Sequence, residues 1–303
     1  MRPALLVSRA AVSLAGFVTL AACTSTGTDG SPATTGADVP GGVGHVHGLE
    51  VNPADGVLYA ATHSGLFAVE GTTIRPVGDA LRDTMGFTIT GPDVFLASGH
   101  PGAGEPGPAN LGVLRSDDSG ETWHELSLVG QSDFHVLTAE TSRVYGWDST
   151  SGIVGRSDDG GRTWRNGAQL AARDLEAVPG GDGRLIATTV DGLLLSADGG
   201  DAFGAFPTPS PTPLVVIDHV PATAGPGTDG AGEANVPPVL SGLDIDGALW
   251  TFDGQRWSGP GSSMGPPQEL VAVGGGSFVA AFDARIYRTD DSGRTWREIT
   301  PSE

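Results

Sequence analysis

The sequence of 303 residues contains no lysine and a single cysteine, Cys23. One cysteine excludes an internal disulfide, so packing and hydrogen bonds must hold the fold. The formal net charge of −20 repels phosphate groups, which argues against nucleic acid as a partner. Helical periodicity is nearly absent and glycine is abundant at 48 residues. This composition favours an all-β fold.

Long apolar runs are also absent, apart from one near the N-terminus. Arg2 and Arg9 give a positive head to the apolar run over residues 10–22, which predicts an export signal at residues 1–22. The run ends in Leu-Ala-Ala-Cys, which resembles a bacterial lipobox. The resemblance implies cleavage before Cys23, lipidation of its sulfur and anchorage on the outer side of the cytoplasmic membrane.

The rest of the chain divides into a short linker and one domain. Residues 23–43 are rich in Thr, Ser, Gly, Pro and Ala, and we expect a flexible tether there. Residues 44–303 are ample for one large β domain. We expect a monomer that reaches the membrane through its lipid.

One short motif organises this domain. The pattern Ser/Thr-x-Asp-x-Gly-x-Thr-Trp occurs at residues 116–123, 157–164 and 289–296, with a worn copy at 196–203. Its Asp can accept backbone hydrogen bonds, its Gly suits positive φ, and its Thr-Trp pair begins a strand with an apolar anchor. We therefore predict self-fastened hairpin turns. Their structural residues are Ser116, Asp118, Gly120, Trp123, Ser157, Asp159, Gly161, Trp164, Thr289, Asp291, Gly293 and Trp296.

The motif resembles the Asp-box, or BNR repeat, of sialidase-like β-propellers. Six units of four short strands each can be aligned on the turns, at residues 45–78, 85–128, 134–170, 173–206, 213–261 and 268–301. Such repetition implies a six-bladed β-propeller with Asp-boxes between the third and fourth strands of a blade. The first and last units each supply all four of their strands, so we expect that no strand is swapped between the terminal blades to close the ring. Residues 101–110 and 222–238 are expected surface insertions.

Histidines are predicted to gather on the face opposite the Asp-boxes. In a four-stranded blade, the first strand starts and the second strand ends on that face. Aligning the first strands puts His47, Met85, His135, Asp174 and Glu269 in one ring around the channel. The second strands close on His63 and His100, and in the last two blades on Asp244 and Asp283. With His45, five of the seven histidines are expected at this mouth, whereas His124 and His219 fall elsewhere.

Imidazoles and a thioether at one mouth suit a transition metal. The candidate ligands are His45, His47, His63, Met85, His100 and His135. Imidazole binds zinc, copper, nickel or iron, and the methionine favours copper, so a copper-like or zinc ion is the expected cofactor. Three alternatives remain open: protonated imidazoles could bind an anion, the mouth could bind an organic or carbohydrate ligand, or the histidines could fill the channel and bond carbonyl groups.

The Asp-box resemblance also raises glycosidase chemistry. Sialidases need an arginine triad and a tyrosine nucleophile, and their usual Phe/Tyr-Arg-Ile-Pro segment is absent here. Tyr59, Tyr145 and Tyr287 all fall inside expected strands. A glycosidase that uses a carboxylate pair would take Asp174 and Glu269 as its catalytic candidates.

The whole domain resembles a group of secreted bacterial lipoproteins. They carry His-Val-His-Gly-Leu, Met-Gly-Phe, Ser-Gly-His-Pro and Asp-Phe-His ahead of Asp-boxes, found here at residues 45–49, 85–87, 98–101 and 133–135. Their usual glycosyl-hydrolase-like label follows the repeat and identifies no catalytic residue. The leading hypothesis is a non-catalytic, lipid-anchored binding protein for a metal. The alternatives are a glycan-processing hydrolase and a scaffold for an envelope protein complex.

Overall fold

The computed structural model describes residues 42–78, 82–180, 183–220 and 239–300. The chain divides into two units, residues 1–33 and 34–303. The export signal, Cys23, most of the tether and the insertion at 222–238 lie outside the described residues. Within the described ranges, no helix is long and apolar enough to cross a membrane.

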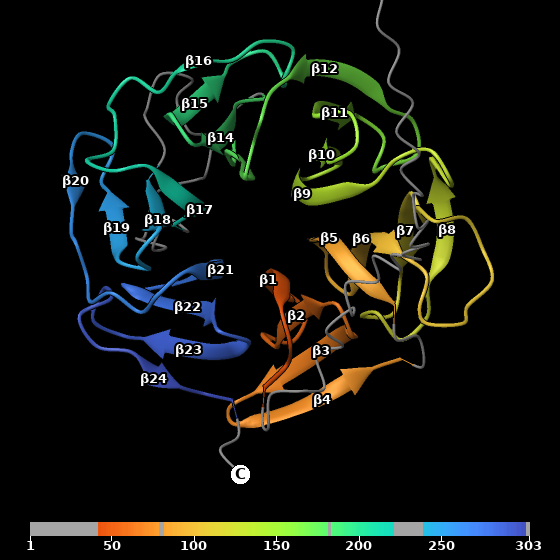
Figure 1. The fold of residues 1–303 in the computed structure, drawn as a ribbon, viewed down its shortest axis with the longest axis horizontal. Coiled ribbons are helices and arrows are strands. Elements are labelled where there is room, and N and C mark those ends of the chain that lie inside the picture. Colours follow the sequence, from red (N-terminus) through yellow and green to blue (C-terminus); the bar gives the residue numbers. More distant parts are fainter. Residues whose placement is uncertain (1–41, 79–81, 181–182, 221–238, 301–303) are drawn as a thin grey trace, which may run out of the picture. The chain divides into compact units, whose positions relative to one another are not determined.

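The second unit is a six-bladed β-propeller, as predicted. Six antiparallel sheets of four strands surround a channel, and consecutive strands pair within each blade (Figure 1). The first three blades are β1 (Val46–Val51), β2 (Leu58–Thr62), β3 (Gly65–Glu70), β4 (Thr73–Val77); β5 (Asp83–Gly91), β6 (Val94–His100), β7 (Val113–Ser116), β8 (His124–Ser127); and β9 (Phe134–Glu140), β10 (Arg143–Asp148), β11 (Ile153–Ser157), β12 (Arg165–Gln169).

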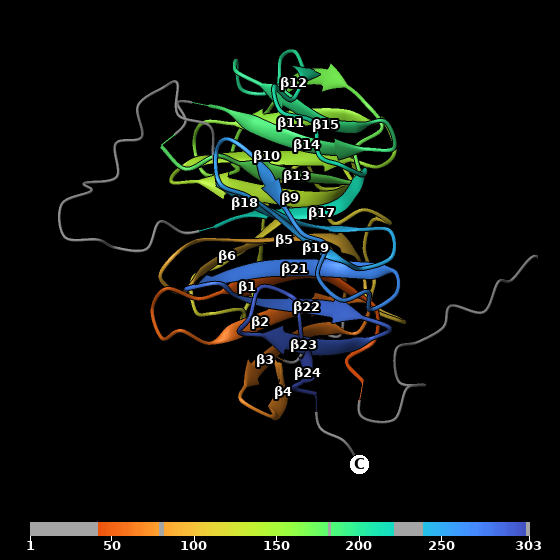
Figure 2. The ribbon, with the colours of Figure 1, turned by 90° about the vertical axis from the view of Figure 1, so that its left-hand side faces the viewer.

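The last three blades follow the same order. They are β13 (Asp174–Ala177), β14 (Leu185–Thr189), β15 (Gly192–Ser196), β16 (Gly204–Ala205); β17 (Leu214–His219), β18 (Leu240–Asp244), β19 (Leu249–Phe252), β20 (Trp257–Ser258); and β21 (Pro267–Gly274), β22 (Ser277–Phe282), β23 (Arg285–Thr289), β24 (Arg297–Glu298). The first strand of each blade lines the channel. In the side view the strands run from one side of the propeller to the other, so the turns that join them lie on two opposite faces (Figure 2).

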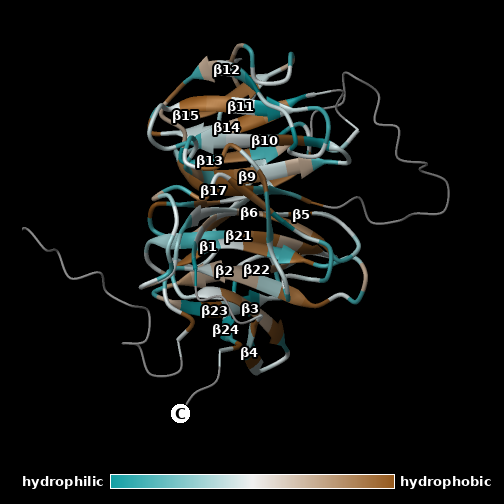
Figure 3. Ribbon diagram, turned by 90° about the vertical axis from the view of Figure 1, so that its right-hand side faces the viewer, coloured by the Kyte–Doolittle hydropathy of each residue, from teal (hydrophilic) through white to brown (hydrophobic). Residues whose placement is uncertain are grey.

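The core is divided among the interfaces between neighbouring blades. Each of the six interfaces holds one cluster of buried apolar side chains, because both faces of every blade are covered. Hydrophobic colour accordingly runs along the strands, and hydrophilic colour marks many of the turns (Figure 3). The first and last blades each keep four strands of their own. They meet through packing of Val46 and Leu49 against Val271 and Ile286, and through a hydrogen bond from the Val43 amide to the Ala284 carbonyl.

The Asp-boxes fasten the turns between the third and fourth strands. In the second copy, the Asp159 carboxylate accepts hydrogen bonds from the Thr163 amide at 2.8 Å and the Thr163 hydroxyl at 2.7 Å. Ser157 Oγ accepts the Gly161 amide at 2.8 Å. Gly161 has a φ of 87°, which only glycine adopts without strain. These bonds hold the pKa of Asp159 at about 2.

Trp164 anchors this turn to the third blade. Its ring lies 4.7 Å from the Phe134 ring, centroid to centroid, and its indole N–H donates to the Gly161 carbonyl at 2.9 Å. We expect Trp164→Ala to lower the free energy of unfolding by about 3 kcal/mol, since a large side chain leaves a packed site. The control Trp164→Phe keeps a ring and loses only the donor, at about 1 kcal/mol. Chemical denaturation measures both values, and equal losses would contradict this account.

Candidate metal centre

A β-bulge opens the inner strand in five of the six blades, where one residue has no partner on the second strand. The unpaired residues are His47, Met85, His135, Val215 and Gln268. A bulge bends the strand and redirects the side chain of the extra residue. The three residues of the first three blades therefore stand at equivalent places at the channel mouth, as their alignment predicted.

The alignment of Asp174 and Glu269 with these residues is wrong by one position. Gln268 is the bulged residue of the sixth blade, and Asp174 pairs regularly with Thr188. A buried apolar residue marks the shared register in every inner strand. These residues are Leu49, Phe87, Leu137, Leu175, Ile217 and Leu270. Asp174 and Glu269 precede this level directly, at the place of Gly48, so they lie deeper in the channel than His47.

Two imidazoles meet at the mouth. His47 lies on β1 and His63 directly follows β2, which brings His47 Nε2 to 3.2 Å from His63 Nε2. His47 Nε2 also lies 3.3 Å from His63 Nδ1, so it faces the edge of the His63 ring between the two nitrogens. His63 Nδ1 in turn lies 2.7 Å from an oxygen of Asp83, the first residue of β5. A carboxylate on one ring nitrogen orients the imidazole and leaves the other nitrogen free for a ligand. We call His45, His47, His63 and Asp83 the first histidine group.

His45 completes this group with a different partner. Its ring centroid lies 4.6 Å from that of His47 and 5.5 Å from that of His63. Gln268 Oε1 accepts the Val46 amide at 3.3 Å, so the amide nitrogen of Gln268 faces His45 Nδ1 at 2.9 Å. His45 is thereby linked to the sixth blade, and its Nδ1 is occupied as an acceptor.

Burial disfavours the charged form of two members of this group, His45 and His47. Desolvation, reinforced by the neighbouring imidazoles of His45 and His63, lowers the pKa of His47 to about 2. Burial and His63 also lower the pKa of His45. His47 is therefore a neutral imidazole at physiological pH, which is the form that binds metal ions. The alternative, in which protonated imidazoles bind an anion, requires a positive charge that burial disfavours at His45 and His47.

Three further residues form a second histidine group, made of His100, Asp133 and His135. Asp133 Oδ2 lies 3.0 Å from His135 Nε2, and Asp133 Oδ1 lies 3.6 Å from His100 Nε2. His100 ends β6 directly opposite Asp83 on β5, so the two groups are neighbours. The predicted histidines thus gather in two groups, each completed by an aspartate that sequence reasoning did not include. Met85 is buried at its bulge.

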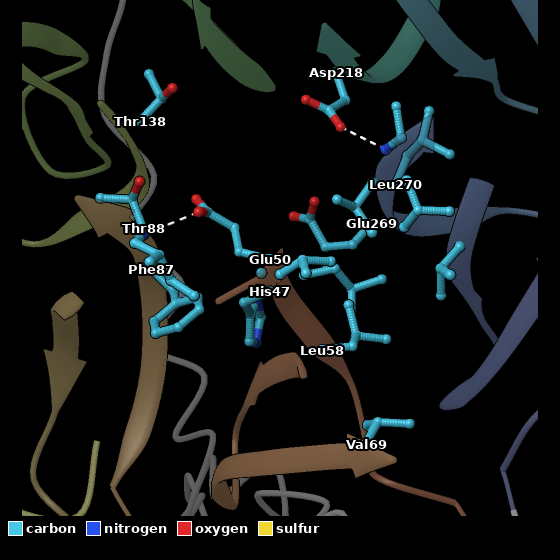
Figure 4. A pocket seen from close by; sticks show the side chains of 18 of the residues that line it. His47, Glu50, Leu58, Val69, Phe87, Thr88, Thr138, Asp218, Glu269 and Leu270 are labelled. Atoms are coloured by element: carbon cyan, nitrogen blue, oxygen red, sulfur yellow. Dashed lines mark hydrogen bonds between the residues drawn. The ribbon is translucent and has the colours of Figure 1, made fainter. Parts of the chain in front are cut away.

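Below the mouth, carboxylates line a cavity of about 900 Å³ (Figure 4). Glu50, Glu269 and Asp218 point into it, and Asp174, Glu176 and His219 also contribute to its wall. Several of them bind the inner strand of the next blade. Glu50 accepts the Ile89 amide at 2.9 Å, Asp174 the Ile217 amide at 2.8 Å and Asp218 the Ala272 amide at 2.6 Å.

Burial and contacts in the channel shift the pKa values of its carboxyl groups and of His219. Desolvation raises the pKa of Glu50 to about 8 and that of Asp174 to about 8, and also raises that of Glu269. Burial alone would lower the pKa of His219, but the adjacent Asp218 and Glu176 carboxylates outweigh it and raise the pKa to about 11. Sequence reasoning placed His219 away from the mouth. It did not find the carboxylates that line the cavity, although Glu50, Glu176 and Asp218 recur on inner strands.

The catalytic candidates Asp174 and Glu269 share this layer. Both oxygens of Asp174 accept backbone amides, from Leu175 and Ile217. Burial raises the pKa of both residues, which suits a glycosidase general acid better than its base or nucleophile. Both residues lie on inner strands, and this position fits a structural role in which their carboxyl groups hold the inner strands in place.

Fold and site together define a six-bladed β-propeller with a histidine-rich mouth and an acidic channel. The sequence matches no protein-family model and no curated protein. Solved structures do resemble it. A GH74 xyloglucanase from Xanthomonas campestris matches with a TM-score of 0.53 and 19% identity, over 85% of this chain and 45% of that chain. A GH74 enzyme from Niastella koreensis matches with a TM-score of 0.56 and 14% identity, over 84% of this chain and 37% of that one.

A further similar structure is YCF48 bound to a D1 peptide, with a TM-score of 0.52 and 14% identity, over 85% of this chain and 81% of that chain. The present chain thus spans less than half the length of the GH74 enzymes and most of YCF48. At these identities the likeness establishes the fold alone.

Proposed function

We propose that this protein is a non-catalytic binding propeller that holds a transition-metal ion at its channel mouth. The observation that carries the proposal is the 3.2 Å separation between His47 Nε2 and His63 Nε2. Two nitrogens bound to one tetrahedral ion at about 2.0–2.1 Å lie about 3.3 Å apart. The first histidine group therefore presents two ligand atoms at nearly the spacing that an ion requires.

The protonation state and the surrounding contacts support the same function. His47 is held neutral by its environment, so an ion displaces no proton from it. Asp83 orients His63 through Nδ1, as carboxylates do behind metal-bound histidines. His45, released from Gln268, or the thioether of Met85 is the natural third ligand. Imidazole ligands suit zinc or copper, and a thioether would select copper(I).

Metal binding by the purified chain with both histidine groups intact tests this function. The chain should be prepared without a histidine tag and with Cys23→Ser, so that no thiol competes for the ion. We expect bound Zn²⁺ or Cu⁺ in the protein after desalting, and a higher Tm with added metal. At a hundredfold excess over Kd, one bound ion adds about 2.7 kcal/mol. A preparation that retains no metal and shows no thermal shift with either ion would end the proposal.

We also propose that the protein is exported as a monomer and anchored by lipid at Cys23 on the outer side of the cytoplasmic membrane. The Leu-Ala-Ala-Cys segment behind the apolar run supports this location. In the native host the protein should pellet with membranes and resist washing with high salt. Cys23→Ser should move it to the soluble exported fraction, and an unchanged distribution would contradict the anchor.

A glycan or an envelope protein is the alternative ligand. The structural likeness to YCF48, whose structure holds a D1 peptide, supports a protein partner, and the GH74 neighbours support a glycan. Mild solubilisation of membranes followed by co-purification would detect a protein partner. A panel of chromogenic glycosides tests hydrolysis, with Asp174→Asn and Glu269→Gln as the variants that should abolish any turnover.

A further inference from the structure

We propose that the mouth carries a second, separate metal site, formed by His100, Asp133 and His135, which takes a borderline divalent cation such as Zn²⁺. One ligand atom from each residue lies within 4.8 Å of the other two. Ligand atoms around a tetrahedral ion at about 2.1 Å are about 3.4 Å apart, so a contraction on the order of 1.4 Å at most closes the group. None of these residues belongs to the first histidine group.

Asp133 is the first piece of evidence. The residue is only 7% exposed, and its two oxygens are treated differently. Oδ2 accepts the Ser149 hydroxyl at 2.6 Å and lies 3.0 Å from His135 Nε2, whereas the buried Oδ1 has no hydrogen-bond partner. A buried carboxylate oxygen without a partner is costly, and a bound cation is one of the few groups that removes this cost.

His100 is the second piece of evidence, and it faces that same oxygen. Its Nδ1 lies 2.9 Å from the Ala109 carbonyl, which accepts only from an N–H. In the neutral imidazole, Nε2 is then an unprotonated acceptor. This nitrogen lies 3.6 Å from Asp133 Oδ1. Two acceptors that face each other repel unless a cation lies between them.

The surroundings hold this geometry in place. Ala109 belongs to the insertion at residues 101–110, so the insertion sets the tautomer of His100. The Asp133 backbone is tied to the end of β10, because its amide donates to Asp148 Oδ2 at 2.9 Å. Two imidazoles and one carboxylate form the donor set of zinc and of non-haem iron(II) sites, and the carboxylate disfavours copper(I). The second site thus differs in chemistry from the first.

Zn²⁺ titration of the full chain carrying Cys23→Ser tests the second site, with a chromogenic chelator as competitor. We expect two tight equivalents in this parent protein. His100→Gln and Asp133→Asn should each lose one equivalent, and so should His63→Gln, which removes the other site. The matched control His124→Gln replaces an exposed histidine outside both groups and should keep two. Loss of a ligand should weaken the affected equivalent by more than about 100-fold.

The outcomes separate the two proposals. A single equivalent that survives His100→Gln and disappears in His63→Gln overturns the second site alone. A single equivalent with the reverse pattern supports the second site and removes the first. An NMR spectrum of the metal-free chain that shows a proton on His100 Nε2 at pH 7.5 would also overturn the second site. In that state Nε2 donates to Asp133 Oδ1 and no cation is needed.

Discussion

Replacing His63 by alanine should abolish the stabilisation that metal gives to this propeller through the first histidine group. The variant keeps the fold, because the side chain is exposed at the end of a strand and fills no core. It removes one of the two nitrogens that lie 3.2 Å apart, and with it one of the two ligand atoms. We expect the apparent Kd at this group to rise by more than about 100-fold, so that its share of the metal-induced thermal shift disappears at the original metal concentration.

A graded series makes this result specific. Asp83→Asn keeps an oxygen near His63 Nδ1 but loses the negative charge, and should weaken binding by about 10–100-fold. His47→Ala should match His63→Ala. His124→Ala, which removes an exposed histidine at the start of β8, should bind as the wild type does. Differential scanning fluorimetry across a metal titration measures all four. If His124→Ala and His63→Ala weaken binding equally, the ion is bound elsewhere.

Raising the pH from 6.5 to 8 should destabilise the metal-free protein. Glu50 and Asp174 have folded pKa values near 8, above their ordinary range, so the folded state holds these protons between about pH 4.5 and 8 while the unfolded chain releases them. The free energy of unfolding therefore falls through that window. His219 acts in the same direction, because its folded pKa of about 11 exceeds the ordinary value of 6.5.

His47 acts in the opposite direction, but only in acid. Its pKa of about 2 means that stability rises with pH between about 2 and 6.5 and is constant above that value. The channel acids therefore dominate above pH 6.5. At 1.36 kcal/mol per pH unit, Glu50 alone accounts for about 2 kcal/mol between pH 6.5 and 8. Urea denaturation at constant ionic strength measures this loss.

Glu50→Gln isolates the effect of one channel carboxyl. Glutamine resembles the protonated acid and can still accept the Ile89 amide, so the variant should equal the wild type below about pH 4.5 and gain on it as the pH rises, by about 2 kcal/mol between pH 6.5 and 8. Glu125→Gln, on an exposed stretch of β8, should follow the wild type at every pH. Parallel pH profiles for Glu50→Gln and the wild type would show that Glu50 titrates normally.

The sequence was sufficient to predict the architecture, because the Asp-box carries its own hydrogen bonds. Asp159, Thr163 and Gly161 lie within a few residues of one another, and their contacts do not depend on the rest of the chain. The repeat then gave the number of blades. Each of the six expected units corresponds to one blade of four strands. Local interactions are the ones that a sequence displays directly.

The site was predicted only in part, because it depends on contacts between blades. The histidines were found by counting along strands, which works for His47 and His135 since the bulges fall at equivalent places. The fourth blade lacks that bulge, so the count was wrong by one residue for Asp174. Asp83 and Asp133 were not expected as partners of His63 and His100, because Asp83 begins β5, Asp133 directly precedes β9, and each approaches its histidine from the neighbouring blade.

The ends of the ring meet without exchanging a strand, and this has a mechanical consequence. Only apolar packing and a few hydrogen bonds join the first blade to the sixth, and one of the joints is the Gln268 side chain between Val46 and His45. Drawing His45 into a metal shell would break its bond to Gln268 and so loosen the bond that Gln268 accepts from the Val46 amide. The contact between the first and sixth blades would then depend on whether an ion occupies the mouth. The hydrogen-exchange rate of the Val46 amide would be the first to change when the site fills or empties.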